Sequence, residues 1–415
     1  MIEAGSKFWY GLKSEVYVHL CEDKALVYDT ERKRVLISED RHVLGLLGMV
    51  DGEDSLGCTL VDWDRQPSSV QHWILMTCDD GMALTFLYDS MVNRPVILRP
   101  LLSLNKDVDK IKNKADLPLL FDKIITRFLS NLNIYVNSGC GCSCAKCGEY
   151  CKQFPFCCNF GQSGEAALSP LQLTTVLKEA SIFQLNHINI FGGDVYDSSV
   201  VKTIRDASCR LSMRFRFYVH YQVYQKNEFV DSQEICLLIP AGFDTARLLD
   251  VYESLRDSKV SFCFVVEQEG DIRVIEELVR DYDMLRYQLY PFYTGENKSF
   301  FEKNVYMTEN ELMHTQLSLR EIFRNQKLNA NNFGSLYVLP DGSIKSNIGG
   351  FVLGYVGHDS FSDVICKELA GHAAWRKIRD AMPCSQCIFQ YICPPPSGYE
   401  QVMKRNNLCY VHYNE

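Results

Sequence analysis

The chain has 415 residues, of which 47% are hydrophobic and 23% are charged, a composition typical of globular proteins. This length predicts two to three domains, each able to bury its own core. The formal charge of -9 predicts no nucleic-acid partner, because such binding needs a basic surface. The first residues lack a basic segment before an apolar one and no apolar run is bilayer-length, so we expect a cytoplasmic protein with no membrane partner.

Residues 1–115 carry short strand signals separated by polar turns, which predict a small meander with one amphipathic helix. The expected strands are 15–20, 25–30, 34–37, 73–76 and 83–88, and the expected helix is 43–50. A segment rich in lysine and aspartate at 105–116 predicts a linker, and a helix at 119–129 should lead into the next domain.

Residues 116–320 alternate strand and helix signals, which predicts a parallel sheet with right-handed crossovers. The expected strands are 132–136, 187–191, 214–219, 235–239, 260–266 and 285–290. The expected helices are 170–180, 198–207, 245–255 and 272–282. Six units are too few for a closed eight-stranded barrel, so we expect an α/β fold with a partial (β/α)6 barrel and a site at the carboxyl ends of its strands.

Residues 321–415 predict a β-hairpin at 335–344, a helix at 370–379 and a cysteine-rich end. The chain has eighteen cysteines, seven of them between positions 140 and 158 and four between 384 and 409. In a chain without a secretory signal, grouped cysteines indicate metal ligation more than disulfides.

The first cysteine group contains Cys140, Cys144 and Cys147, which follow directly on the first expected barrel strand. Three thiolates at this spacing can hold three irons of a cubane cluster and leave the fourth iron open to a small molecule. The same loop is also compatible with a zinc site, for which another cysteine of the group would supply the fourth ligand. The spacing by itself leaves both possibilities open.

The second expected barrel strand ends at Gly192, Gly193 and Asp194. Glycines let a backbone approach a ligand closely, and carbonyl groups with a carboxylate suit an ammonium group. An ordinary glycine turn is the alternative. The last cysteine group has a tight spacing that indicates either a cubane cluster or a structural zinc site. Its members are Cys384, Cys387, Cys393 and Cys409.

This order of a cysteine triad, a Gly-Gly-acid strand end and a four-cysteine tail resembles the radical S-adenosylmethionine (SAM) enzymes with a SPASM extension, over nearly the whole chain. The N-terminal stretch is similar to a RiPP recognition element, a winged-helix module that binds leader peptides of ribosomally made precursors. The phrases 384–400, 407–409 and 152–154 are closest to the pseudo-radical-SAM proteins of GG-Bacteroidales peptide systems, many of which are thought to lack the triad.

The resemblance implies three domains: a leader-binding module at 1–115, a radical SAM partial barrel at 116–320 and a SPASM-like auxiliary-cluster domain at 321–415. It implies one [4Fe-4S] cluster on the triad, one auxiliary [4Fe-4S] cluster on the four-cysteine tail, and S-adenosylmethionine on the open iron. The residues expected to contact S-adenosylmethionine are Gly192, Gly193, Asp194 and Glu267.

Several positions depart from the family pattern. Asp194 stands where the family usually has glutamate, Lys146 stands where an aromatic usually packs near adenine, and Cys142 is an extra thiol that could compete for iron. Ser397 and Ser346 stand where a full SPASM domain has cysteines, so the ligands of a second auxiliary cluster are missing.

The resemblance implies an enzyme that modifies a leader-bearing precursor peptide through a 5′-deoxyadenosyl radical, with a flavodoxin- or ferredoxin-like electron donor. The leader is expected to add as a strand to the N-terminal module, with 27–37 as the candidate segment. The alternative is a catalytically inactive protein of the same fold that binds or escorts a precursor for a partner enzyme. The intact triad favours the enzyme, and the changes at Asp194 and Lys146 favour the alternative.

Overall fold

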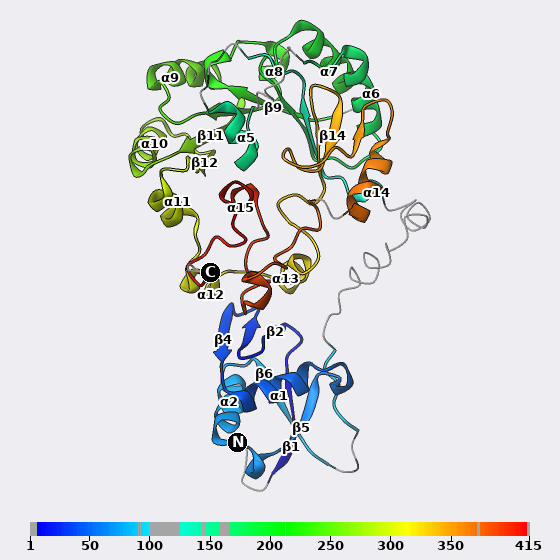
Figure 1. The fold of residues 1–415 in the computed structure, drawn as a ribbon, viewed down its shortest axis with the longest axis vertical. Helices are drawn as coiled ribbons and strands as arrows, with labels where there is room; N and C mark the ends of the chain where they lie inside the picture. The colour runs from blue at the N-terminus through cyan, green and yellow to red at the C-terminus, as the bar shows by residue number, and fades with distance from the viewer. Residues whose placement is uncertain are drawn as a thin grey trace.

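The computed structural model describes residues 6–89, 91, 93–98, 125–140, 142, 144, 146–157, 166–211, 213–371 and 374–412. Its parts are arranged along one long axis, as Figure 1 shows. The N-terminal module lies at one end, the body built on the large sheet lies at the other, and the C-terminal part of the chain lies between them. No described helix is long and apolar enough to cross a membrane.

The body is built on a nine-stranded sheet in the order β12-β11-β10-β9-β8-β7-β13-β14-β15. All six barrel strands expected from the sequence are present and pair in parallel. They are β7 Asn131–Tyr135, β8 His187–Phe191, β9 Phe215–His220, β10 Glu234–Ile239, β11 Lys259–Val266 and β12 Tyr287–Pro291. In the described residues the first and last strands of this order do not pair with each other, so the sheet is open. The large parallel sheet is consistent with a partial barrel.

The tail hairpin joins the same sheet. Its first strand, β13 Ser335–Val338, pairs in parallel with β7, and β14 Ser343–Lys345 and β15 Gly354–Tyr355 follow in antiparallel order. The hairpin expected at 335–344 is therefore confirmed, and it extends the barrel sheet past β7.

Helices cover one face of the sheet. They are α6 Pro170–Ala180, α7 Ser198–Leu211, α8 Glu228–Asp231, α9 Thr245–Ser254 and α10 Glu269–Tyr282. The bounds expected for α6 are confirmed, because Pro170 opens the helix and Ser169 and Gln172 close a capping box around its first turn. The short α8 was not expected; Asn227 caps it through its side chain.

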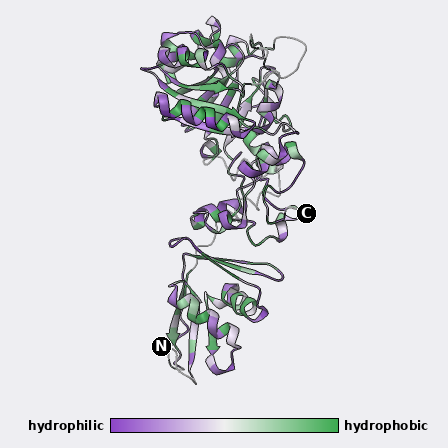
Figure 2. Cartoon of the chain, turned by 90° about the vertical axis from the view of Figure 1, so that its left-hand side faces the viewer, coloured by the Kyte–Doolittle hydropathy of each residue, from purple (hydrophilic) through white to green (hydrophobic). Residues whose placement is uncertain are grey.

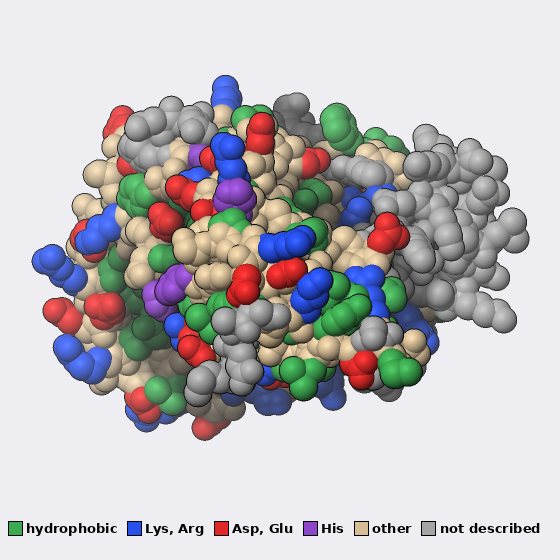
Figure 3. All heavy atoms as spheres, turned by 90° about the horizontal axis from the view of Figure 1, so that it is seen from below, with side chains coloured by type: hydrophobic (Ala, Val, Ile, Leu, Met, Phe, Trp, Pro, Cys, Tyr) green, Lys and Arg blue, Asp and Glu red, His purple; other side chains and the backbone are tan. Residues whose placement is uncertain are grey.

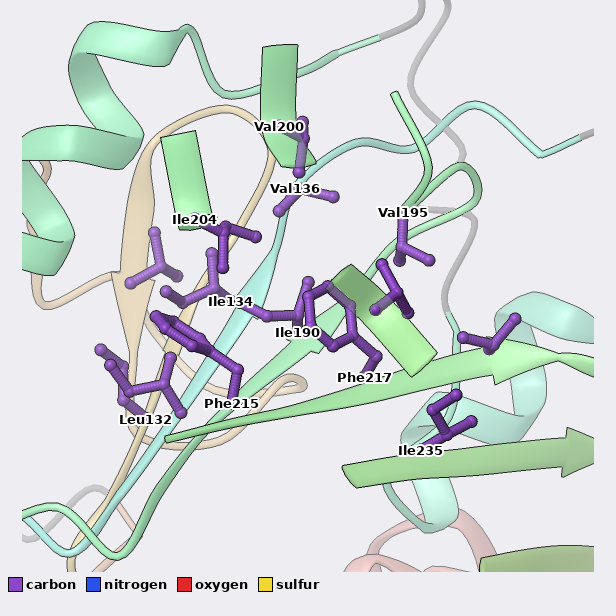
Figure 4. Packing of buried hydrophobic residues seen from close by; sticks show 14 of the residues in the cluster. Leu132, Ile134, Val136, Ile190, Val195, Val200, Ile204, Phe215, Phe217 and Ile235 are labelled. Atoms are coloured by element: carbon purple, nitrogen blue, oxygen red, sulfur yellow. The ribbon is translucent and has the colours of Figure 1, made fainter. Parts of the chain in front are cut away.

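Successive side chains of each strand point to opposite faces of the sheet. Alternate apolar residues of β7, β8 and β9 point toward the helices and pack against Val200 and Ile204 of α7 (Figure 4). On the opposite face, Tyr135, Phe191 and Tyr218 stack in a row, with ring centroids 4.7 Å and 4.1 Å apart. Figure 2 shows the strands as mainly hydrophobic, whereas the covering helices mix hydrophobic and hydrophilic residues.

The described residues of the N-terminal module form two three-stranded sheets and two α-helices. One sheet is β5-β1-β6 and the other is β2-β3-β4. The strands are β1 Lys7–Leu12, β2 Val16–Leu20, β3 Ala25–Asp29, β4 Arg34–Ser38, β5 Cys58–Asp62 and β6 Ala83–Leu87, and the helices are α1 Arg41–Asp51 and α2 Ser68–Asp79. Acidic and basic side chains are interspersed on the face of the molecule shown in Figure 3.

The strand expected at 73–76 is wrong, because this run lies inside α2. The buried residues of α2 have the spacing of a helix face; they are Val70, Trp73, Ile74 and Thr77. A four-residue apolar run does not by itself distinguish a strand from a helix. The linker expected at 105–116 lies outside the described residues. Of the helix expected at 119–129, the described part contains only the 3-10 turn Ile125–Arg127.

The helix expected at 370–379 is also wrong, since the helix there is α14 Phe361–Gly371. The buried carboxylate of Glu368 explains the early end. It accepts hydrogen bonds from the backbone N–H groups of Ala374 and Trp375 at 2.7 Å and 2.6 Å. These bonds turn the chain back onto the end of the helix, so residues 374–379 cannot continue it.

The N-terminal module docks on the C-terminal part of the chain through an apolar interface. Tyr17, Leu26 and Tyr28 of the β2-β3-β4 sheet are buried there. They form one cluster with Leu312, Ile322, Cys387, Ile388, Phe389 and Ile392. The Tyr28 hydroxyl donates to the Thr315 carbonyl at 2.8 Å and accepts from the Leu317 N–H at 3.0 Å. Residues that are far apart in the sequence thus share one core.

We expect Tyr28→Phe to lower the free energy of unfolding by about 1 kcal/mol, because it leaves a partly buried N–H and a partly buried carbonyl without their partner. Urea unfolding and hydrogen exchange of the Leu317 amide measure the effect. Tyr282→Phe is the matched control, since the Tyr282 side chain is exposed. Equal stability changes in the two variants would contradict the assigned role of the Tyr28 hydroxyl.

Candidate functional site

The predicted site residues of the barrel lie at one edge of the sheet. The triad loop follows β7, Gly192 and Gly193 follow β8, and Glu267 follows β11. Because the paired strands are parallel, their carboxyl ends meet at this edge, where open α/β folds bind ligands.

The loops after β7 and β8 touch at Gly193. A Cβ atom added to Gly193 would lie 1.6 Å from the carbonyl oxygen of Gly139 and 2.6 Å from the backbone nitrogen of Cys140. No side chain larger than hydrogen fits between these backbones. The Asn137 side chain joins the same two loops, donating to the Asp194 carbonyl at 2.6 Å and accepting from the Asp194 N–H at 2.9 Å. The Gly-Gly turn therefore holds the triad loop against the second strand end.

Asp194 itself is exposed at this turn. Its Oδ1 accepts a hydrogen bond from the Tyr196 N–H at 2.9 Å. The carboxylate is thus attached to the turn that fixes the triad loop.

The thiols of the triad loop interact with one another. Burial, and after it the neighbouring thiols of Cys147 and Cys140, raises the pKa of Cys144 to about 11. Burial likewise raises the pKa of Cys142 to about 12, with Cys140 and Cys144 adding to the shift. Like charges raise each other's pKa only at short range, so the loop gathers these sulfurs in one place.

His220, the last residue of β9, lies between two of these thiols and was missed by the sequence analysis. Its Nε2 is 3.3 Å from the Cys144 Sγ and its Nδ1 is 3.5 Å from the Cys142 Sγ. Burial lowers the pKa of this imidazole to about 4, so the ring is neutral. Its position directly after the expected parallel strand 214–219, where the site was expected, was the available signal.

A cavity of about 920 Å³ opens beside the triad loop at the same edge. Cys144, Lys146, Tyr150 and Glu267 line it together with Tyr221, Gln222, Pro240, Ala241, Gly242, Phe243, Gln268, Asp271, Thr294, Glu296 and Asn297. The Lys146 ammonium forms an ion pair with Glu267 at 2.6 Å and lies 5.6 Å from the centroid of the Phe292 ring. Lys146 thus pairs with the predicted ligand contact Glu267 in the lining of this cavity.

The four tail cysteines also come together. Burial raises the pKa of Cys393 to about 12; Arg379 opposes this shift, and Cys409, Cys387 and Cys384 add to it. The buried guanidinium of Arg379 lies 3.9 Å from the Cys384 Sγ and pairs with the buried carboxylate of Glu400 at 2.7 Å. A cation at this place favours thiolates and offsets part of their mutual repulsion.

The two serines at the missing cysteine positions are held by protein groups. Ser397 caps helix α15 Gly398–Met403, and its hydroxyl donates to Glu400 at 2.6 Å. The Ser346 hydroxyl donates to Glu368 at 2.6 Å in the interior. Both hydroxyls thus belong to hydrogen-bond networks built on buried carboxylates.

Both donor sets suit iron–sulfur clusters, since each offers only thiols at its predicted ligand positions. Within the described ranges, no three His, Cys, Asp or Glu side chains converge on the position of a single metal ion. A cubane demands less convergence, because each thiolate binds a different iron. Of the alternative zinc ligands, Cys151 is disulfide-bonded, whereas Cys158 lies outside the described residues.

The fold and the site together define an α/β protein with an open, largely parallel sheet, a thiol-rich loop at the carboxyl ends of its strands and a cavity beside that loop. No family model matches the chain, and no curated protein matches its sequence. Solved structures do match it. The crystal structure of Streptococcus suis SuiB bound to the precursor peptide SuiA has a TM-score of 0.50 and 12% identity, and covers 96% of this chain and 98% of that chain.

Two further structures match with lower scores. SuiB bound to S-adenosylmethionine has a TM-score of 0.46 and 11% identity, and covers 96% of this chain and 97% of that chain. Native anSMEcpe with bound AdoMet and the Cp18Cys peptide has a TM-score of 0.43 and 13% identity, and covers 67% of this chain and 95% of that chain. The match to peptide-bound SuiB shows a shared fold over nearly the whole of both chains.

We expect Gly193→Ala to destabilise the protein by about 1–3 kcal/mol or more, because the new methyl group overlaps the backbone of the triad loop. Thermal unfolding measures the change, and alkylation of the triad thiols measures the displacement of the loop. Gly270→Ala is the control, since its added Cβ meets its nearest atom only at 4.0 Å. A Gly193→Ala variant as stable as this control would refute the close packing.

Proposed function

We propose that the chain is a radical SAM enzyme that modifies a ribosomally made precursor peptide. The observation that carries the proposal is the grouping of the triad thiols on a loop fixed by Gly193, with Cys144 bordering a cavity of about 920 Å³. Cys140, Cys144 and Cys147 would hold a [4Fe-4S] cluster. The fold shared with SuiB, a protein solved with a precursor peptide, supports a peptide partner for this chain.

A [4Fe-4S] cluster bound here would supply the electron that cleaves S-adenosylmethionine to a 5′-deoxyadenosyl radical. The residues around the cavity would bind and orient that cofactor. Asp194, exposed at the second strand end, would attract its ammonium group, and the backbone of Gly192 and Gly193 would border it. Glu267 lines the cavity next to Cys144 and would face the adenosine.

The tail cysteines would hold one auxiliary [4Fe-4S] cluster. Cys384, Cys387, Cys393 and Cys409 are grouped beside the buried Arg379, whose charge offsets part of the negative charge of four thiolates. We propose a flavodoxin- or ferredoxin-like protein as the electron donor.

A leader peptide would bind the N-terminal module by strand addition. In the candidate segment 27–37, β3 is the central strand of its sheet, so both of its edges are occupied. In the described residues, β4 Arg34–Ser38 has no strand on its outer edge. We therefore narrow the candidate from 27–37 to β4, where main-chain hydrogen bonds would supply affinity.

The inactive escort is the second candidate function, and the Lys146–Glu267 ion pair favours it. The pair at 2.6 Å lies in the cavity that would take S-adenosylmethionine. A bound adenosine would have to displace or accommodate both charged groups, whereas an aromatic residue at position 146 would offer it a stacking surface. A protein that only binds the precursor peptide has no need to free this space.

Iron counting with replacement of single cysteines tests the proposal. Anaerobically reconstituted protein should bind about eight irons per chain, about four for each [4Fe-4S] unit. Cys144→Ala should lose about half of this iron and all release of 5′-deoxyadenosine from S-adenosylmethionine with dithionite. Cys387→Ala should lose the other half and keep the triad iron.

Cys209→Ala is the matched control. Because Cys209 is exposed on α7, its replacement should leave the iron content and the cleavage of S-adenosylmethionine unchanged. Full iron without any cleavage in the wild-type protein would support the escort. Cleavage that survives Cys144→Ala would overturn the assignment of the triad.

A further inference from the structure

His220 contacts both the predicted ligand thiol Cys144 and the extra thiol Cys142. This residue ends β9 and is only 3% exposed, so water does not satisfy its ring nitrogens. Its Nδ1 is 3.3 Å from the N–H of Gln222 and 3.5 Å from the Sγ of Cys142. Its Nε2 is 3.3 Å from the Sγ of Cys144.

These partners assign the tautomer of the ring. A neutral imidazole carries one N–H donor and one acceptor nitrogen. The backbone N–H of Gln222 can only donate, so Nδ1 is the acceptor. Nε2 therefore carries the proton and donates to the sulfur of Cys144.

The same assignment separates the two thiols. Since Nδ1 accepts, it can take a hydrogen bond from the Cys142 S–H at 3.5 Å, but it has no proton to donate to a Cys142 thiolate. A protonated thiol is not a metal ligand, whereas a thiolate accepting an N–H hydrogen bond is stabilised as one. The imidazole thus stabilises Cys144 as a ligand thiolate and does not stabilise Cys142 in the same way.

The surrounding structure fixes the ring in this orientation. His220 begins the 3-10 turn Tyr221–Val223 through the bond from Gln222 to its side chain. The buried ring of Tyr221 lies 5.3 Å from the imidazole. The strand end and the turn therefore present Nε2–H to the triad loop.

We propose that His220 is a positioning residue of the triad cluster. It donates a hydrogen bond from Nε2–H to the Cys144 thiolate and keeps Cys142 as a non-ligating thiol. The inference rests on the proposed function and adds a consequence to it. An N–H dipole aimed at a ligand sulfur stabilises the more negative, reduced cluster, so His220 raises the reduction potential.

The test is a redox titration of the triad cluster, followed by electron paramagnetic resonance in the Cys387→Ala background so that the tail site does not contribute. Adding His220→Gln should lower the ratio of reduced to oxidised cluster about tenfold at a fixed potential, which equals about 59 mV for a one-electron couple. The control is His187→Gln, because His187 begins β8 at the opposite end of the sheet. An equal reduction potential in the His220 and His187 variants would contradict the proposed hydrogen bond from His220 to Cys144.

Iron counting in a Cys142→Ala variant gives a second test, which needs no variant at His220. The anaerobically reconstituted variant should keep about eight irons per chain, because Cys142 is not a ligand. Loss of about half of this iron would overturn the separation of the thiols. A wild-type protein without iron at the triad would refute the proposed function itself, which distinguishes that failure from a failure of the His220 assignment.

Discussion

The contact between Gly193 and the Gly139–Cys140 backbone is the constraint on which the candidate site depends. It joins the loops after two neighbouring parallel strands at van der Waals distance, with no room for a side chain. Because both loops grow from buried strands, their relative position is set by the sheet, and Asn137 adds two hydrogen bonds across the junction. This junction fixes the position of the triad loop, whose Cys144 contacts His220 and borders the cavity.

The C-terminal part of the chain connects the N-terminal module to the large sheet. The loop that carries Cys387 also supplies Ile388, Phe389 and Ile392 to the interface with the N-terminal module. The tail strand β13 meanwhile pairs with β7, the strand that leads into the triad loop. The tail is therefore in contact with both the module proposed to hold a leader and the sheet that presents the candidate site.

Buried carboxylates hold two serines of the C-terminal part of the chain, Ser346 and Ser397. A serine hydroxyl in the interior needs hydrogen-bond partners, and Glu368 and Glu400 provide them. Glu400 in turn pairs with Arg379, which lies beside the remaining thiols. The Glu400–Arg379 pair thus both satisfies Ser397 and balances the proposed ligand set.

The sequence by itself determined the order of the barrel strands, the bounds of α6 and the grouping of its cysteines, because alternation, capping and ligand spacing are local patterns. It did not distinguish the helix at 68–79 from a strand or locate the end of α14, since burial in α2 and hydrogen bonds to Glu368 decided them. Only the tertiary structure brought His220 to the thiols and Lys146 to Glu267. Those pairs are 76 and 121 residues apart in the chain, and their contacts depend on how the parallel strands align.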